Sequence, residues 1–185
     1  MIKTLLFVFF ISCTALGAFA QTKSLPQLSF GADYGLPGGS ATGIYGTAIG
    51  GSAKLELPVS HSKFNFVLTT GISEYILKFY YSGTAQNATM ITPLEVGGKY
   101  YFSKIGYVEA DFGLAVDRYS EFLPNEPNAV NVTNKGFVYS PGIGFTAPTR
   151  KHKAAVDIGL RYETRAESTQ TMSQLALRVA YRFGI

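Results

Sequence analysis

The sequence predicts an all-β protein: an eight-stranded antiparallel up-and-down transmembrane β-barrel that follows an N-terminal signal peptide. Three observations predict this fold. Apolar and polar residues alternate with a period of two along most of the chain. No apolar run after the N-terminus approaches the roughly 18 residues that a transmembrane helix needs. From the second connection onward, short and long connections alternate along the chain between the segments of alternating hydropathy.

The N-terminus has the features of an export signal. Lys3 is its only charged residue, an apolar run extends from Leu5 to Ile11, and Ala18-Phe19-Ala20 supplies a small-x-small cleavage pattern. We therefore expect residues 1–20 to form the signal peptide and residues 21–185 the barrel domain. The alternative, Cys13 as a lipidation site, would leave an unusually short signal before the cysteine.

Composition narrows the function classes. The chain has 20 Gly, 12 Tyr and 14 Phe, only 15% charged residues, and a single Cys that lies in the predicted signal. The mature chain therefore has no cysteine for a disulfide framework or for thiolate chemistry. The formal net charge of +4 is scattered along the chain, so nucleic acid is not expected as a partner.

Eight segments place apolar residues on one face and polar or small residues on the other. In the first, Phe30 and Tyr34 share a face, and Asp33 lies on the opposite one. Successive side chains of a strand point to opposite sides, and the segments have about the length of a tilted membrane strand. In chain order the predicted strands are 28–36, 45–57, 64–72, 94–102, 108–116, 137–147, 154–162 and 175–183.

The connections predict an orientation. They are 37–41, 58–62, 74–90, 103–105, 118–135, 148–152 and 164–172. The second, fourth and sixth are short, whereas the third, fifth and seventh are longer and polar; the first, 37–41, is unusually short for an external loop. Outer-membrane barrels have short periplasmic turns and longer external loops, so we expect both termini to be periplasmic.

Aromatic residues gather near both ends of the predicted strands. Amphipathic rings favour the level of the lipid headgroups, so two girdles are expected. The periplasmic girdle would contain Phe64, Phe66, Tyr100, Phe102, Tyr181 and Phe183, and the outer girdle Tyr45, Phe137, Tyr139 and Tyr162.

Pro141 does not fit a regular strand. It lies within the sixth segment, and a closed barrel has no free edge at which a missing N–H would be harmless. We predict a bulge or a locally broken ladder at this residue.

The polar faces carry charges of both signs. An eight-stranded barrel leaves an interior that side chains just fill, and unpaired charges there are costly, so these groups should pair. Lys99 is expected to face Glu109, and Arg178 and Arg182 to lie between Asp157 and Asp33. The favoured interpretation is a polar plug rather than an ion path, with a lumen network of Asp33, Lys54, Glu56, Glu95, Lys99, Glu109, Asp111, Asp157, Arg161, Glu163, Arg178 and Arg182.

Catalytic, cofactor and metal sites have little support in the sequence. His61 and His152 both fall in predicted turns, with no third metal ligand or nucleophile at a suitable spacing. A lipid-modifying enzyme would need Ser120 or Ser168 to converge with a base and an acid at the outer rim. The acids and bases available there are Glu74, Tyr75, Asp117, Arg118, Glu163 and Arg165. We therefore expect no enzyme activity, no cofactor and no metal.

The fifth connection offers a candidate partner loop. In its segment Glu121–Pro127, Phe122 and Leu123 would be exposed apolar residues at the tip, and Pro124 and Pro127 would stiffen the loop. The alternative, that the two apolar side chains fold back on the barrel rim, is equally consistent with the sequence.

Two segments resemble a known family. Pro93–Phe102, followed by Tyr107-Val108-Glu109-Ala110, is similar to the central hairpin of the outer-membrane β-barrel domain family, which includes the PorT-type barrels associated with secretion. Val179–Phe183 resembles its closing strand, whose terminal aromatic residue is read by the barrel-assembly machinery. Here Gly184-Ile185 follow Phe183, which departs from that pattern. The resemblance implies a Gram-negative outer-membrane protein and carries over no catalytic residue.

Three function hypotheses follow. The leading one is a structural or interaction barrel that lies in outer-membrane lipid and contacts a protein or surface through its long external loops. The others are a secretion-associated or narrow transport barrel and a lipid-modifying enzyme. A soluble periplasmic barrel, with apolar residues inside and charges outside, is a rival fold because periodicity alone does not say which face points inward.

Overall fold

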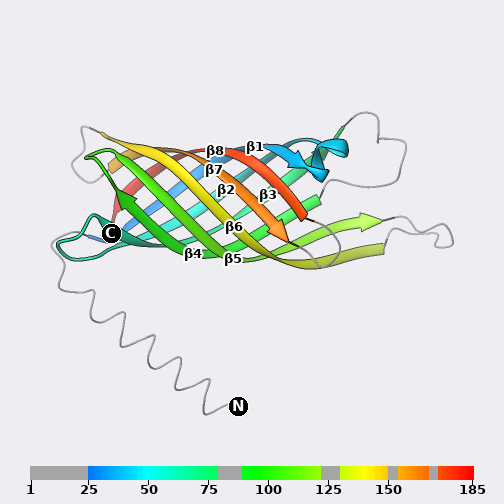
Figure 1. Ribbon diagram of the computed structural model, residues 1–185, viewed down its shortest axis with the longest axis horizontal. Coiled ribbons are helices and arrows are strands. Elements are labelled where there is room, and N and C mark those ends of the chain that lie inside the picture. The colour runs from blue at the N-terminus through cyan, green and yellow to red at the C-terminus, as the bar shows by residue number, and fades with distance from the viewer. Residues whose placement is uncertain (1–24, 79–88, 122–129, 150–153, 167–170) are drawn as a thin grey trace, which may run out of the picture.

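The computed structural model describes residues 25–78, 89–121, 130–149, 154–166 and 171–185. Within them, eight antiparallel strands form one closed barrel in which each strand pairs with its neighbours in sequence, and β8 closes on β1 (Figure 1). The strands are β1 (Gln27–Gly39), β2 (Tyr45–Pro58), β3 (Phe64–Leu77), β4 (Thr89–Tyr101), β5 (Gly106–Glu121), β6 (Val130–Pro148), β7 (Ala154–Ala166) and β8 (Thr171–Gly184), with a short 3-10 turn at Ser40–Gly43.

All eight predicted strands are confirmed, and most are longer than predicted at one end of the barrel. β3 and β4 meet at Tyr75↔Thr89, and β5 and β6 at Glu121↔Val130. The prediction of a long seventh connection is wrong, because β7 and β8 stay paired to Ala166↔Thr171 and only residues 167–170 join them. Polar residues beyond the apolar band give no alternating signal, so the pattern stops before the strands do.

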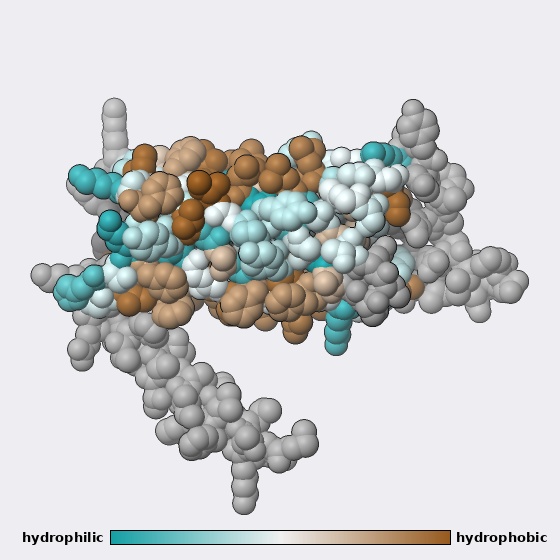
Figure 2. Space-filling view, viewed as in Figure 1, coloured by the Kyte–Doolittle hydropathy of each residue, from teal (hydrophilic) through white to brown (hydrophobic). Residues whose placement is uncertain are grey.

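The alternation of the strands sorts side chains by polarity. Apolar side chains cover the outer wall: Leu114 is 65% exposed, Leu94 58% and Phe30 56%. Figure 2 shows such side chains spread over much of the barrel wall. Charged groups point inward, and Glu95 and Lys99 are both fully buried. This arrangement contradicts the soluble rival with an apolar interior.

The ladder around Pro141 confirms the prediction of a local break. β6 pairs with β5 without a shift through Ala110↔Pro141. On the other side, pairing with β7 stops after Tyr139↔Thr164 and resumes at Gly142↔Arg161 in the same register. The break therefore lies between β6 and β7, where proline supplies no N–H, and no extra residue is inserted.

One member of the predicted outer girdle points inward instead. The register of β2 and β3 shifts between Tyr45 and Thr47, and this irregularity reverses the direction of Tyr45. Its ring meets that of Tyr75 edge-on at 5.5 Å, and its hydroxyl group lies 2.8 Å from that of Thr89. Phe137, Tyr139 and Tyr162 are exposed on the outer wall as predicted.

Three of the connections lie at the same end of the barrel as the first and last described residues of the chain. Residues 59–63, 102–105 and 149–153 connect strands at the end where β1 begins and β8 finishes. Ile185 is held there by a hydrogen bond from its N–H to the Pro26 carbonyl oxygen, at 2.9 Å.

Among the described residues, no helix combines the length and the apolar character needed to cross a membrane.

Glycine at position 97 makes room for a lumen carboxylate, which yields a stability prediction. A Cβ on Gly97 would overlap Asp111 Oδ1 and the Ala110 carbonyl oxygen, whereas a Cβ on Gly51 would meet only a carbonyl oxygen at 3.5 Å. We expect Gly97→Ala to lower the free energy of unfolding by about 1–3 kcal/mol through overpacking. Gly51→Ala is the matched control and should change it little.

Urea unfolding in detergent micelles, followed by far-UV circular dichroism, measures both variants. Equal midpoints for the two would show that the Asp111 carboxylate does not need the space above Gly97.

Candidate functional site

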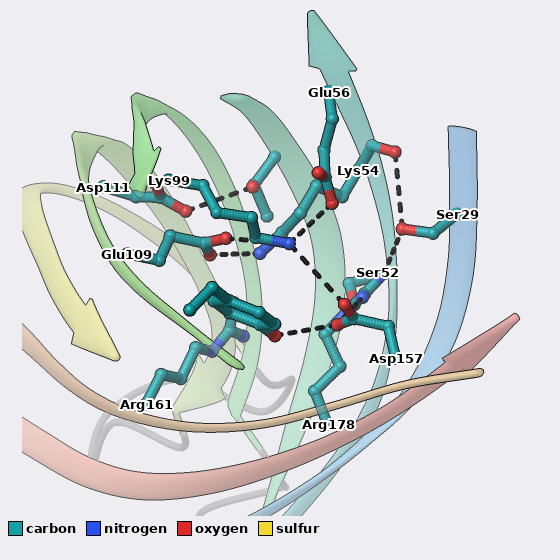
Figure 3. A network of polar contacts seen from close by, with 12 residues as sticks. Ser29, Ser52, Lys54, Glu56, Lys99, Glu109, Asp111, Asp157, Arg161 and Arg178 are labelled. Atoms are coloured by element: carbon teal, nitrogen blue, oxygen red, sulfur yellow. Dashed lines mark hydrogen bonds and ion pairs between the residues drawn. The ribbon is translucent and has the colours of Figure 1, made fainter. Parts of the chain in front are cut away.

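A network of charged side chains fills the lumen and is the candidate functional site. All twelve residues of the predicted network lie inside the barrel, and β1, β2, β4, β5, β7 and β8 all contribute. Figure 3 labels eight of them: Lys54, Glu56, Lys99, Glu109, Asp111, Asp157, Arg161 and Arg178. Their inward direction follows from strand periodicity, because each lies an even number of positions from the next charge on its strand.

Lys99 of β4 is the centre of the network at the end of the barrel that holds the C-terminus. Its ammonium lies 2.5 Å from Glu56 Oε1, 3.4 Å from Glu109 Oε2 and 3.6 Å from Asp157 Oδ2. The same nitrogen lies 3.9 Å from the centroid of the Tyr107 ring. Three acids from three different strands therefore share one buried cation, and the tyrosine ring adds a cation–π contact.

The acids around Lys99 have further partners. Lys54 forms an ion pair with Glu109. Arg182 Nη1 lies 3.3 Å from Glu56 Oε2 and donates a hydrogen bond of 2.5 Å to the Tyr101 hydroxyl. The Tyr101 hydroxyl in turn donates to Glu56 at 3.1 Å. β4 and β8, on different sides of the barrel, are thus connected through one glutamate of β2.

Arg178 of β8 connects this cluster to the middle of the lumen. Its Nε donates to Ser52 Oγ at 2.8 Å, and Ser52 Oγ donates to Asp33 Oδ2 at 2.6 Å. Arg178 Nη1 also lies 3.7 Å from Asp157 Oδ1. Asp33 is directly opposite Arg178 in the register, but its carboxylate forms an ion pair with Arg161, at 3.7 Å. Arg178 thus lies between Asp157 and Asp33, whereas Arg182, for which the same placement was expected, is opposite Ser29 and pairs with Glu56.

A second cluster lies toward the other end of the lumen, and the predicted network included only Glu163 of it. Arg165 Nη1 donates to Asp117 Oδ2 at 2.6 Å, Arg165 Nε lies 3.8 Å from Glu163 Oε1, and the guanidinium carbon is 5.0 Å from the centroid of the Tyr75 ring. Sequence analysis assigned these residues to the rim. Their positions have the inward parity of Asp111 and Glu163, and this signal could have found them.

An apolar cluster lies in the lumen at the same level. It is formed by Ala41, Ala48, Tyr75, Ile91, Ala115, Val138 and Met172, all buried. The plug is therefore not purely polar as predicted, because side chains from six strands and the 3-10 turn pack across the barrel beside Arg165.

Acids outnumber bases in the described lumen. Every buried base has an acidic partner: Lys54, Lys99, Arg161, Arg165, Arg178 and Arg182. Six acids share these partners: Asp33, Glu56, Glu109, Asp117, Asp157 and Glu163. Glu95 and Asp111 are buried without an ion pair among the described residues; Asp111 accepts a hydrogen bond from Thr69 at 3.2 Å.

The lumen leaves little free space around the basic groups. A cavity of about 20 Å³ is lined by Lys54, Tyr107, Glu109, Arg161 and Arg178 together with glycines of β6 and β7. This volume holds roughly one water molecule. It provides no room for an organic ligand.

The remaining candidates of the sequence analysis fall elsewhere. The partner-loop residues Phe122, Leu123, Pro124 and Pro127 lie outside the described residues, as do Cys13, His152 and Ser168, and the Ser120 side chain is not described either. His61 is exposed in the turn between β2 and β3 and hydrogen-bonds Ser60 at 2.7 Å. Within the described ranges, no group of three or more His, Cys, Asp or Glu residues could hold a metal ion.

Solved structures share this architecture. Ail of Yersinia pestis superposes with a TM-score of 0.60 at 12% identity, over 86% of this chain and 99% of Ail. Neisserial surface protein A gives 0.55 at 15% identity (86% and 97% covered), and the N-terminal barrel domain of Pseudomonas aeruginosa OprF gives 0.55 at 12% (85% and 97%). Neither a protein-family model nor a curated protein matches the sequence. At these identities the likeness establishes the fold of an eight-stranded outer-membrane barrel and nothing finer.

The network predicts opposite effects for two buried charges on β4. Lys99→Met leaves Glu56 and Asp157 with fewer cationic partners, and breaking a buried ion pair from one side costs about 3–5 kcal/mol. Glu95→Gln removes a carboxylate that has no ion pair, so it should leave stability unchanged or raise it. Unfolding midpoints in detergent, read from the shift between folded and unfolded bands on gels, compare the two.

The result that would contradict this account is a Lys99→Met barrel as stable as the parent, or a Glu95→Gln barrel destabilised by as much as Lys99→Met.

Proposed function

We propose that this protein lies in the outer membrane of a Gram-negative bacterium and acts there as an anchor for a contact surface at its external rim. The observation that carries the proposal is the combination of an apolar outer wall with a lumen filled by paired charges. Such a wall suits outer-membrane lipid, and a filled lumen leaves the rim as the place for function.

The lumen favours anchoring over transport. Lys99 and Arg165 are each held by acids from other strands, and the apolar cluster of Tyr75, Ile91 and Val138 lies across the barrel. A transport route would require several of these contacts to break together. The secretion-associated alternative, including membership of the PorT-type group, rests on the resemblance of β4, β5 and β8 to that family.

The enzyme alternative receives less support from the rim. Asp117 and Glu163, two acids that a lipid-modifying site could use, are both within ion-pair distance of Arg165. The ion pairs with Arg165 give both acids a structural role. We therefore favour a protein without catalytic activity, inserted by the barrel-assembly machinery and meeting a protein or surface outside the cell.

The orientation can be tested by labelling single cysteines. Lys135 of β6 and Lys63 in the turn before β3 are both exposed and lie at opposite ends of the barrel. With both termini periplasmic, a membrane-impermeant maleimide should label Lys135→Cys on intact cells but label Lys63→Cys only after the outer membrane is permeabilised. The parent chain, whose single Cys13 lies in the predicted signal, is the control.

Recovery of the protein in the soluble periplasmic fraction would contradict membrane insertion. Labelling of Lys63→Cys on intact cells would contradict the orientation.

A further inference from the structure

β5 and β6 project beyond the neighbouring strands at the rim (Figure 1). They remain paired from Gly106↔Phe145 to Glu121↔Val130. β7 pairs with β6 only as far as Phe137↔Ala166. From Val130 to Gly136, therefore, β6 has no strand partner on its β7 side among the described residues.

The connection that follows β7 is too short to cover this edge. The chain has only residues 167–170 between Ala166 and Thr171, where β8 begins. Four residues span at most roughly 14 Å. The edge from Val130 to Gly136 is roughly 23 Å long, and the connection must also turn back. This connection therefore cannot pair along most of the edge, which has no strand partner among the described residues.

The break at Pro141 shows which backbone groups face the open side. Residues of a strand direct their N–H and C=O groups alternately to the two neighbours. Pro141 interrupts pairing with β7 and leaves pairing with β5 intact, so odd-numbered residues of β6 direct these groups toward β7. Beyond Phe137, the same parity places the N–H and C=O groups of Asn131, Thr133 and Lys135 on the open edge.

We propose that this edge binds an extended segment of another protein as an additional β-strand. The proposal rests on the anchoring function above and names the surface that the anchor presents. Unpaired N–H and C=O groups in a row are a template for strand addition, in which the main chain supplies affinity and alternate side chains supply specificity.

The charge of the outward face specifies the partner. Arg118 and Lys135 are exposed there, two residues from each other along the paired ribbon: Arg118 is opposite Thr133, and Val116 is opposite Lys135. Opposite charges on neighbouring strands stabilise pairing. The added segment should therefore carry acidic residues at alternate positions, with β-branched residues between them.

A second copy in the same membrane is a poor occupant. Two copies related by an axis along the membrane normal keep the same vertical direction for β6. With strands tilted by about 35–45°, their edges would cross at about 70–90° instead of running antiparallel. A strand that is free to align along β6 has no such restriction.

A peptide binding assay on the full barrel in detergent tests the proposal. The probe is a fluorescent heptapeptide of alternating valine and glutamate, and its lysine counterpart serves as the charge control. Thr133→Pro removes one edge N–H without touching the ladder with β5, and Thr133→Ala keeps that N–H. We expect fluorescence anisotropy to show binding by the parent and by Thr133→Ala, and about 2- to 10-fold weaker binding by Thr133→Pro, because one hydrogen bond is lost.

Three outcomes would overturn strand addition: no binding by the parent, equal binding by Thr133→Pro and Thr133→Ala, or preference for the lysine peptide. Dimers formed by the parent barrel but not by Thr133→Pro would also overturn the proposal, because they would show that a second copy of the chain occupies the edge. Labelling of Lys135→Cys on intact cells separates the two proposals, since it reports exposure of the rim whether or not the peptide binds.

Discussion

Charge enclosed in a narrow barrel is the constraint on which the rest of this structure depends. An eight-stranded barrel has no room for bulk water, so each ionised side chain in the lumen needs a partner from another strand. Lys99 shows the consequence most clearly. It draws together acids of β2, β5 and β7, and through Glu56 it reaches Arg182 of β8. The network therefore specifies strand register in addition to filling space, because a shift by one residue would turn these groups toward the apolar outside.

The same alternation determines where function can lie. Alternate positions of each strand face the outer wall and the lumen over most of its length. Only beyond the apolar band is this commitment relaxed. There β5 and β6 continue as a paired ribbon whose outward face carries Arg118 and Lys135 and whose β6 edge, which includes Thr133, has no strand partner among the described residues. The barrel can thus be regarded as a rigid support, and the ribbon as the part with unfilled hydrogen-bonding capacity.

Much of this arrangement is encoded in local sequence. The strand number, the closed fold, the twelve lumen charges and the break at Pro141 all follow from a period of two and from what proline lacks. Other features depend on contacts between strands that are far apart in the sequence. The inward direction of Tyr45 depends on a register shift between β2 and β3 that the hydropathy pattern does not predict. Asp117 and Arg165 had the correct parity, yet their position near predicted loops suggested rim residues; they lie on different strands and meet only across the lumen. The length of the β5–β6 ribbon was missed because its polar residues do not alternate in hydropathy.

The ionic conductance of the purified barrel in a planar lipid bilayer tests the central claim most directly. If paired charges and the apolar cluster close the lumen, the parent protein should give no stable open channel over a range of voltages, at both low and high salt. A steady conductance that scales with salt concentration would contradict the account, because it would mean that a continuous aqueous path runs past Lys99 and Arg165.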